Sequence, residues 1–213
     1  MNQPAHPHAG QPVLRRGPAA GQATVAVILV HGRGDSASGI LGLADALDVP
    51  HVMWLAPQAA GHAWYPFSFL VPMERNEPGL SSGLAVIDGL VDTLRGEDLP
   101  PDRIVLMGFS QGACLAQEYA ARHARRYHAI VGLSGGLIGP PGTPRDYAGS
   151  FDGTPVFLGC SDIDAHIPVE RVHESSDVFA RMGAAVDTRI YPGMGHTVNA
   201  EELSVVRALL GGH

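Results

Sequence analysis

The chain has 213 residues, of which 45% are hydrophobic and 16% are charged, a balance typical of a globular protein that can bury its own core without a metal or a disulfide. All 14 basic residues are arginine, which excludes phosphate-loop NTPases and Schiff-base enzymes because both need a lysine. The formal net charge of −7 argues against a nucleic-acid surface, and no apolar run is long enough for stable insertion into a membrane.

Residues 1–22 are predicted to form a flexible amino-terminal arm, and residues 23–213 a single domain. Arg15 and Arg16 precede the apolar run 23–30, an arrangement that faintly resembles a twin-arginine export signal. That run leads directly into a glycine-rich loop to which a functional role is assigned below. Its removal, and therefore export, is not expected.

Neither a disulfide framework nor a metal site is expected. Cys114 and Cys160 are too few for a disulfide scaffold, which favours a reduced, cytoplasmic location. His6 and His8 could bind a stray metal, but they have no further ligands nearby in the sequence. No motif implies a cofactor.

Apolar runs and helical patterns alternate along the chain. Such alternation, with strands that are apolar on both faces, predicts an α/β fold with a mostly parallel sheet covered by helices on both faces. The expected strands are residues 25–30, 51–56, 103–109, 128–133, 155–159 and 186–191. The expected helices are residues 36–47, 81–94, 111–122, 169–182 and 199–210.

Two long connections, residues 57–80 and 135–153, interrupt this alternation. Both follow the carboxyl end of a predicted strand, where open α/β sheets bind their ligands. Loops of this length are uncommon unless they have a function. A binding site is therefore expected at this edge of the sheet, without a large cap domain.

Residues 108–112 match the Gly-x-Ser-x-Gly pattern of a nucleophile elbow, with Ser110 between a predicted strand and a predicted helix. The flanking glycines let the strand and the helix approach each other, and the strained turn exposes the serine hydroxyl. A second match, at 132–136, precedes glycines and prolines that cannot form a helix. Ser134 is therefore interpreted as a turn residue, and Ser110 as the candidate nucleophile.

A serine nucleophile needs a histidine base and an acid, which follow it in the chain order serine, acid, histidine in α/β-hydrolases. His196 fits the base, because it lies in a glycine-rich loop between the last predicted strand and the last predicted helix. Asp162 and Asp164 follow an earlier strand, and either can be the acid. His166 and His173 are interpreted as surface or packing residues.

An oxyanion hole needs two N–H donors. One is expected from the backbone of Gln111, directly after the candidate nucleophile. The other is expected from the backbone of Arg33, in the glycine-rich loop 31–34 that follows the first buried strand.

Nearly the whole chain, from about residue 10, resembles the small phospholipase/carboxylesterase family of α/β-hydrolases, which also includes acyl-protein thioesterases. The resemblance rests on His31-Gly32-Arg33-Gly34, Gly108-Phe109-Ser110-Gln111-Gly112, Leu133-Ser134-Gly135, Asp164-Ala165-His166-Ile167-Pro168 and Gly193-Met194-Gly195-His196. It implies an α/β-hydrolase fold with Ser110, Asp164 and His196 as the triad, and it favours Asp164 over Asp162. Many members have leucine at the position of Arg33 and proline at that of Ala165.

The loop 57–80 is a candidate source of the acyl or alcohol pocket, since ligand sites are mostly apolar. An alternative interpretation is that its apolar residues only hold the loop in place. Arg33 and Arg75 could bind a substrate carboxylate, although solvation at the surface is the more common role of arginine. The predicted substrate-binding residues are Trp64, Tyr65, Phe67, Leu70 and Met73, with Phe69 in the same loop.

The sequence therefore predicts a serine hydrolase that cleaves carboxylic esters of small to medium acyl chains through an acyl-enzyme intermediate. Thioesterase, lysophospholipase and lactone hydrolase activities on the same triad are alternatives. A non-catalytic ligand-binding protein on a hydrolase scaffold is the alternative from another class. The expected partner is a small-molecule ester rather than a nucleic acid or a membrane, and a homodimer is left open.

Overall fold

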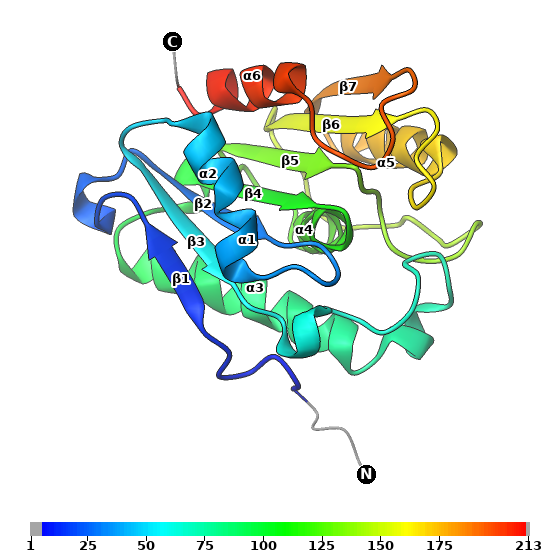
Figure 1. Ribbon diagram of the computed structural model, residues 1–213, viewed down its shortest axis with the longest axis horizontal. Helices are drawn as coiled ribbons and strands as arrows, with labels where there is room; N and C mark the ends of the chain where they lie inside the picture. The colour runs from blue at the N-terminus through cyan, green and yellow to red at the C-terminus, as the bar shows by residue number, and fades with distance from the viewer. Residues whose placement is uncertain (1–5, 212–213) are drawn as a thin grey trace.

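The computed structural model describes residues 6–211, and the seven strands in this range form one sheet (Figure 1). The strands are Val13–Arg16 (β1), Val25–Val30 (β2), Val52–Pro57 (β3), Ile104–Phe109 (β4), Ala129–Leu133 (β5), Pro155–Ser161 (β6) and Ala185–Tyr191 (β7). Their order is β1-β3-β2-β4-β5-β6-β7, and every pair is parallel except β1 with β3. The predicted mostly parallel sheet is confirmed.

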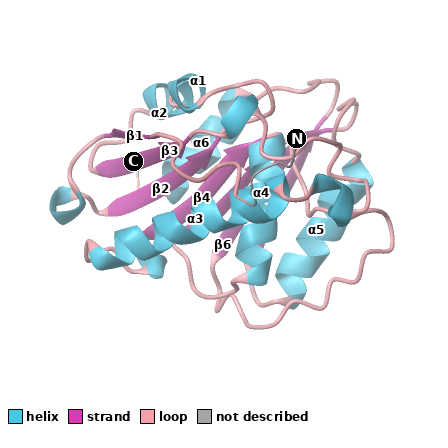
Figure 2. Cartoon of the chain, turned by 90° about the horizontal axis from the view of Figure 1, so that it is seen from below, coloured by secondary structure: helices cyan, strands magenta, loops and turns pink. Residues whose placement is uncertain are grey.

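Helices cover both faces of the sheet, as predicted (Figure 2). They are Ala37–Ile40 (α1), Gly42–Leu47 (α2), Gly79–Gly96 (α3), Gln111–Arg122 (α4), Val169–Arg181 (α5) and Ala200–Leu209 (α6). The apolar sides of α3, α4 and α5 form one core layer with the sheet, and those of α1, α2 and α6 form the other. Burial on both faces explains why β2 and β3 are apolar throughout.

The predicted helix over residues 36–47 is split at Leu41 into α1 and α2. Ser36 caps the first piece, since its side chain accepts the N–H of Gly39. Glycines at positions 39 and 42 weaken a continuous helix here. Short 3-10 turns occupy Ala20–Gln22, Ala60–His62, Met73–Asn76 and Pro101–Arg103.

Residues 6–22 differ from the predicted flexible arm. β1 pairs with β3 at the edge of the sheet, with Val13 opposite Pro57. His8 is 3% exposed, and its ring Nε2–H donates to the carbonyl of Trp64 at 2.8 Å. All four residues of β1 are exposed, so the strand has no apolar pattern that sequence analysis could detect. Residues 1–5 of the predicted arm lie outside the described residues.

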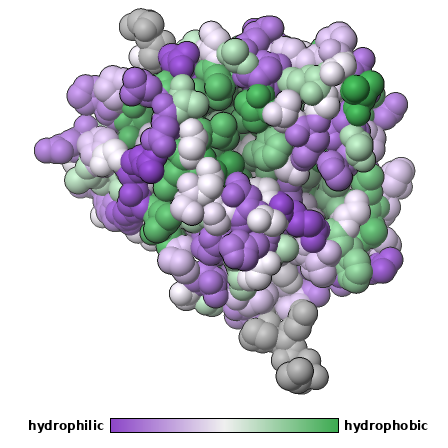
Figure 3. Space-filling model, viewed as in Figure 1, coloured by the Kyte–Doolittle hydropathy of each residue, from purple (hydrophilic) through white to green (hydrophobic). Residues whose placement is uncertain are grey.

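The connections after β3 and β5 remain long loops with, at most, 3-10 turns, and no domain is inserted within residues 6–211. On the side seen in Figure 3, polar side chains occupy much of the surface, and apolar ones form patches between them. In the described part of the chain, no helix combines the length and the apolar character needed to cross a membrane.

Candidate active site

Ser110 lies at the turn between β4 and α4, with a φ of 55° and a ψ of −121°. This backbone conformation is uncommon for a residue with a Cβ, and it aims the side chain away from both elements. A Cβ on Gly108 would lie 2.4 Å from the backbone carbon of Gly112, and one on Gly112 would lie 2.1 Å from the carbonyl oxygen of Val30. Only glycine fits at both positions, which explains the motif sterically.

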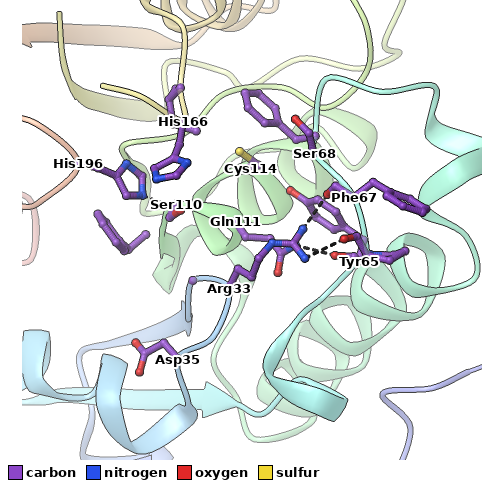
Figure 4. A pocket seen from close by; sticks show the side chains of 15 residues that line it. Arg33, Asp35, Tyr65, Phe67, Ser68, Ser110, Gln111, Cys114, His166 and His196 are labelled. Atoms are coloured by element: carbon purple, nitrogen blue, oxygen red, sulfur yellow. Dashed lines mark hydrogen bonds between the residues drawn. The ribbon is translucent and has the colours of Figure 1, made fainter. Parts of the chain in front are cut away.

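Ser110, His196 and Asp164 form a continuous hydrogen-bonded chain. The Ser110 hydroxyl donates to His196 Nε2 at 2.8 Å, and His196 Nδ1–H donates to Asp164 Oδ2 at 2.7 Å. Because an ionised carboxylate only accepts hydrogen bonds, Nδ1 carries the imidazole proton and Nε2 is left to accept from the serine. Figure 4 shows Ser110 and His196 facing each other in the cavity.

The carboxylate of Asp164 is fully buried, and protein donors surround it. Its Oδ1 accepts the N–H groups of His166 at 2.8 Å and Ile167 at 3.0 Å. Burial by itself would raise the pKa of Asp164, but the hydrogen bonds from His196 and from these two N–H groups outweigh it and lower the pKa below its ordinary value. Asp164 therefore stays ionised and can orient a protonated imidazole.

Asp162, the other candidate acid, does not contact the imidazole. Its Oδ1 accepts the N–H of Gly193 at 2.8 Å, and the hydroxyl of Ser161 accepts the N–H of Gly195 at 3.0 Å. Both contacts hold the loop that carries His196. The two acids thus occupy different positions: Asp164 binds the imidazole, and Asp162 binds the backbone of its loop.

The loop after β2 passes directly beside the candidate nucleophile. A Cβ on Gly32 would lie 3.3 Å from the Cβ of Ser110. Within residues 6–211, the backbone N–H groups of Arg33 and Gln111 have no protein acceptor. The N–H of Gln111 also lies at the positive end of the α4 dipole. Both groups are therefore available to an anion beside Ser110.

Ser110 and His196 line a cavity of about 640 Å³. Tyr65, Phe67 and Phe69 line it from the connection after β3, and we call these three residues the aromatic wall. Other lining residues come from the connection after β3, from the elbow and α4, from the loop after β2 and from the acid loop: Pro66, Ser68, Phe109, Gln111, Cys114, Gly32, Arg33, Asp35, His166 and Ile167. The walls are mostly apolar.

Only part of the predicted substrate-binding set reaches this cavity. Tyr65 and Phe67 line it. Trp64 does not, because its side chain is fully buried and its indole N–H donates to a backbone carbonyl at 2.9 Å. Leu70 and Met73 pack against the core and do not line the cavity. These three residues lie away from this cavity because apolar loop residues can face either the core or the cavity, and their spacing does not distinguish the two.

Several cavity residues were not assigned to the site by the sequence, among them four from the elbow, α4 and the acid loop. Phe109 belongs to the elbow motif, and Cys114 faces the cavity from one turn into α4. Ile167 and His166 follow the acid, and the ring centroid of His166 lies 4.7 Å from that of His196. His166 is exposed, as expected of a surface residue, but it also lines the cavity. The sequence signal that could have assigned His166 to the site was its position close to the candidate acid, Asp164.

The remaining candidate nucleophiles differ from Ser110 in their surroundings. Burial raises the pKa of Cys114 to about 12 and that of Cys160 to about 12, so both thiols stay neutral near pH 7. Ser134 is fully buried, has a φ of 49° and does not line the cavity. No helix begins directly after Ser134, since the next helix in the chain is α5, in agreement with its interpretation as a turn residue.

The sequence profile of the phospholipase/carboxylesterase family matches residues 17–211. The chain belongs to this family. A phospholipase/carboxylesterase of known crystal structure from Dyadobacter fermentans is 38% identical, with a TM-score of 0.91 over 94% of this chain and 96% of that chain. The structure of esterase PE8 is 25% identical, with a TM-score of 0.74 over 94% and 97% of the two chains.

A curated relative points in the same direction. Acyl-protein thioesterase 1 of Gibberella zeae is 30% identical over 217 residues, which cover 91% of this chain and 92% of the relative. The phospholipase/carboxylesterase family member described here is therefore an enzyme, a hydrolase with the α/β-hydrolase fold. The resemblance seen in the sequence motifs is confirmed.

Proposed function

We propose that this protein is a serine hydrolase of carboxylic esters with small to medium acyl chains. The observation that carries the proposal is the chain of hydrogen bonds from Ser110 through His196 to Asp164, at 2.8 Å and 2.7 Å, at the wall of a mostly apolar cavity. A nucleophile, a base with the correct tautomer and an ionised acid are the parts that acyl transfer needs.

In the first half-reaction, Ser110 Oγ attacks the ester carbonyl carbon while His196 Nε2 takes the hydroxyl proton. The carbonyl oxygen becomes an oxyanion, which the backbone N–H groups of Arg33 and Gln111 bind. The bond from the carbonyl carbon to the alcohol oxygen then breaks, and the His196 proton passes to the leaving alcohol. Asp164 stabilises the imidazolium that exists between these two proton transfers.

In the second half-reaction, water attacks the acyl-enzyme. His196 takes one proton from the water, and the resulting oxyanion is bound by the same N–H groups. When the bond to Ser110 Oγ breaks, His196 returns the proton to the serine. The products are a carboxylic acid and a free enzyme, and no redox step or cofactor is needed.

The proposed substrate size follows from the shape and lining of the cavity. A cavity of about 640 Å³ is in the range of small-molecule sites. The aromatic wall offers apolar surface to an acyl or alcohol group, and Ser110 and His196 lie at the cavity wall without an inserted domain above them within residues 6–211. These features favour soluble esters of modest size.

Labelling with a fluorophosphonate and hydrolysis of p-nitrophenyl esters test this proposal. Wild type should be labelled and Ser110→Ala should not, because the probe bonds to an activated serine. His196→Ala should lower kcat by roughly 10³-fold or more. Full activity in either variant would refute the assignment. Absence of both labelling and turnover in wild type would favour a non-catalytic binding protein.

Thioester hydrolysis is the second candidate, and the relationship to a protein named acyl-protein thioesterase 1 favours it specifically. The same attack on a carbonyl carbon expels a thiolate instead of an alkoxide. Matched octanoyl oxyester and thioester substrates separate the two, since their acyl groups are identical. A kcat/KM more than tenfold higher for the thioester would assign the thioesterase function. A lactone and a lysophospholipid in the same panel test the remaining alternatives.

A further inference from the structure

The backbone of residues 64–67, which we call the wall segment, carries two members of the aromatic wall. Its first half is held by Gln111, whose backbone N–H is one of the proposed oxyanion donors. Gln111 Oε1 accepts the N–H of Trp64 at 2.8 Å, and Gln111 Nε2 donates to the carbonyl of Tyr65 at 2.9 Å. The amide is thus engaged at both ends by consecutive residues of the wall segment.

The second half of the wall segment is held by Arg33, whose backbone N–H is the other proposed oxyanion donor, and by Asn76, whose Oδ1 accepts the N–H of Phe67 at 2.9 Å. One terminal nitrogen of its guanidinium donates to the carbonyl of Pro66 at 2.9 Å, and the other donates to that of Phe67 at 2.7 Å (Figure 4). The guanidinium also lies 6.0 Å from the centroid of the Tyr65 ring. A planar cation with two parallel donors can engage two successive carbonyls in this way.

These contacts argue against a second role for Arg33, that of an anchor for a substrate carboxylate. Each terminal nitrogen already donates to a carbonyl oxygen, which leaves fewer of the five N–H groups for a substrate carboxylate. Asp35 also lines the cavity, and its negative charge opposes an anionic substrate. Arg75, the other candidate anchor, lies 4.6 Å over the Phe67 ring and does not line the cavity.

We propose that the Arg33 side chain is a specificity-determining positioning residue, which holds the wall segment in place so that esters with a long apolar group bind a preorganised surface. The inference rests on the proposed esterase activity. It assigns the side chain of residue 33 a role separate from that of its backbone N–H, because the first faces the wall segment and the second is available beside Ser110.

The expected consequence follows from the cost of ordering a loop upon binding. Without the guanidinium, the carbonyls of the exposed residues Pro66 and Phe67 pair with water, and the wall segment samples more conformations. A substrate that packs on the aromatic wall must then order the wall segment when it binds. An acetyl group is too short to need the wall, and the backbone N–H of residue 33 is retained in any variant.

The test compares Arg33→Leu with wild type on p-nitrophenyl acetate and p-nitrophenyl octanoate. We expect kcat/KM for the octanoate to fall about tenfold or more relative to kcat/KM for the acetate, mainly through the KM of the octanoate. Arg75→Leu is the matched control, because it removes the same charge beside Phe67 but no hydrogen bond to the wall segment. It should leave the octanoate-to-acetate ratio within about twofold of wild type.

Several results would overturn the inference. An equal loss on both esters would assign Arg33 to the oxyanion loop alone, and an unchanged ratio would show that the tether has no role in selectivity. The same ratio change in Arg75→Leu would assign the effect to charge. A preference of wild type for the p-nitrophenyl hemisuccinate over the butyrate that Arg33→Leu abolishes would instead identify a carboxylate anchor.

If the proposed esterase function itself is wrong, the experiments should give a different result. Wild type would then hydrolyse neither ester and would not react with a fluorophosphonate. Thermal unfolding of both arginine variants, expected within a few degrees of wild type, separates a loss of selectivity from a loss of folded protein.

Discussion

The nucleophile elbow and the aromatic wall lie on opposite sides of one cavity, but they are held in different ways. At the elbow, backbone packs directly on backbone, so that a Cβ on Gly112 would lie 2.1 Å from the carbonyl oxygen of Val30. The wall segment is held by side chains from elsewhere, among them the Arg33 guanidinium, the Gln111 amide and the Asn76 amide. The first arrangement tolerates almost no sequence change, whereas the second can be altered while the fold remains.

The largest expected effect concerns the two acids beside the elbow. Asp164→Asn should lower kcat by about 10³-fold or more, equivalent to about 4 kcal/mol in the barrier, because an amide N–H opposite Nδ1 favours the wrong imidazole tautomer. Asp162→Asn keeps an oxygen for the Gly193 N–H and should lower kcat less than tenfold. Steady-state kinetics with p-nitrophenyl acetate measure both. Equal losses would contradict the distinct positions assigned to the two acids.

Glycine-to-alanine changes test how tightly the elbow is packed. Gly112→Ala should lower the free energy of unfolding by about 3 kcal/mol, because its Cβ would overlap the backbone of β2. Gly89→Ala makes the same change within α3, where a Cβ meets nothing within 4 Å, and should raise it by about 1 kcal/mol. Urea unfolding measures both values. A Gly112→Ala protein as stable as wild type would show that the elbow can relax.

The smallest expected effect is a pH dependence of the free energy of unfolding, which arises from the buried imidazoles of His8 and His31. The Ala60 N–H donates to His8 Nδ1 and the Ala59 N–H donates to His31 Nε2, so each imidazole is neutral. Burial lowers the pKa of His8 and that of His31 below the ordinary value of 6.5. The unfolded chain therefore binds more protons just below pH 6.5, and the free energy of unfolding should fall as the pH drops through this value.

Thermal unfolding between pH 7.5 and pH 5.5 measures this loss. His8→Gln should show a smaller decrease in Tm over this range than wild type, because one buried imidazole is gone. His173→Gln, at an exposed position of α5, is the control and should behave as wild type. A His8→Gln decrease as large as that of wild type would remove His8 from the explanation.

Local patterns predicted the central part of the fold. β2 and α4 have the predicted bounds, because a strand buried on both faces and a helix that follows a sharp glycine turn leave strong signals in the sequence. β1 left no such signal, since its four residues are exposed and its pairing with β3 is decided by the edge of the sheet. His8 likewise became part of the core through contacts with residues more than fifty positions away.

The sequence by itself determined the family, the parallel sheet, and Ser110 with His196 as candidates, because each depends on short motifs whose backbone geometry admits few residue types. The family resemblance favoured Asp164 as the acid, although the residue pattern alone left both aspartates open. Only the tertiary structure decided which aromatic residues of one loop face the cavity, and that Arg33 contacts the wall segment. Those outcomes depend on where side chains far apart in the chain meet. No local sequence pattern encodes these long-range contacts, since the same residues are compatible with either arrangement.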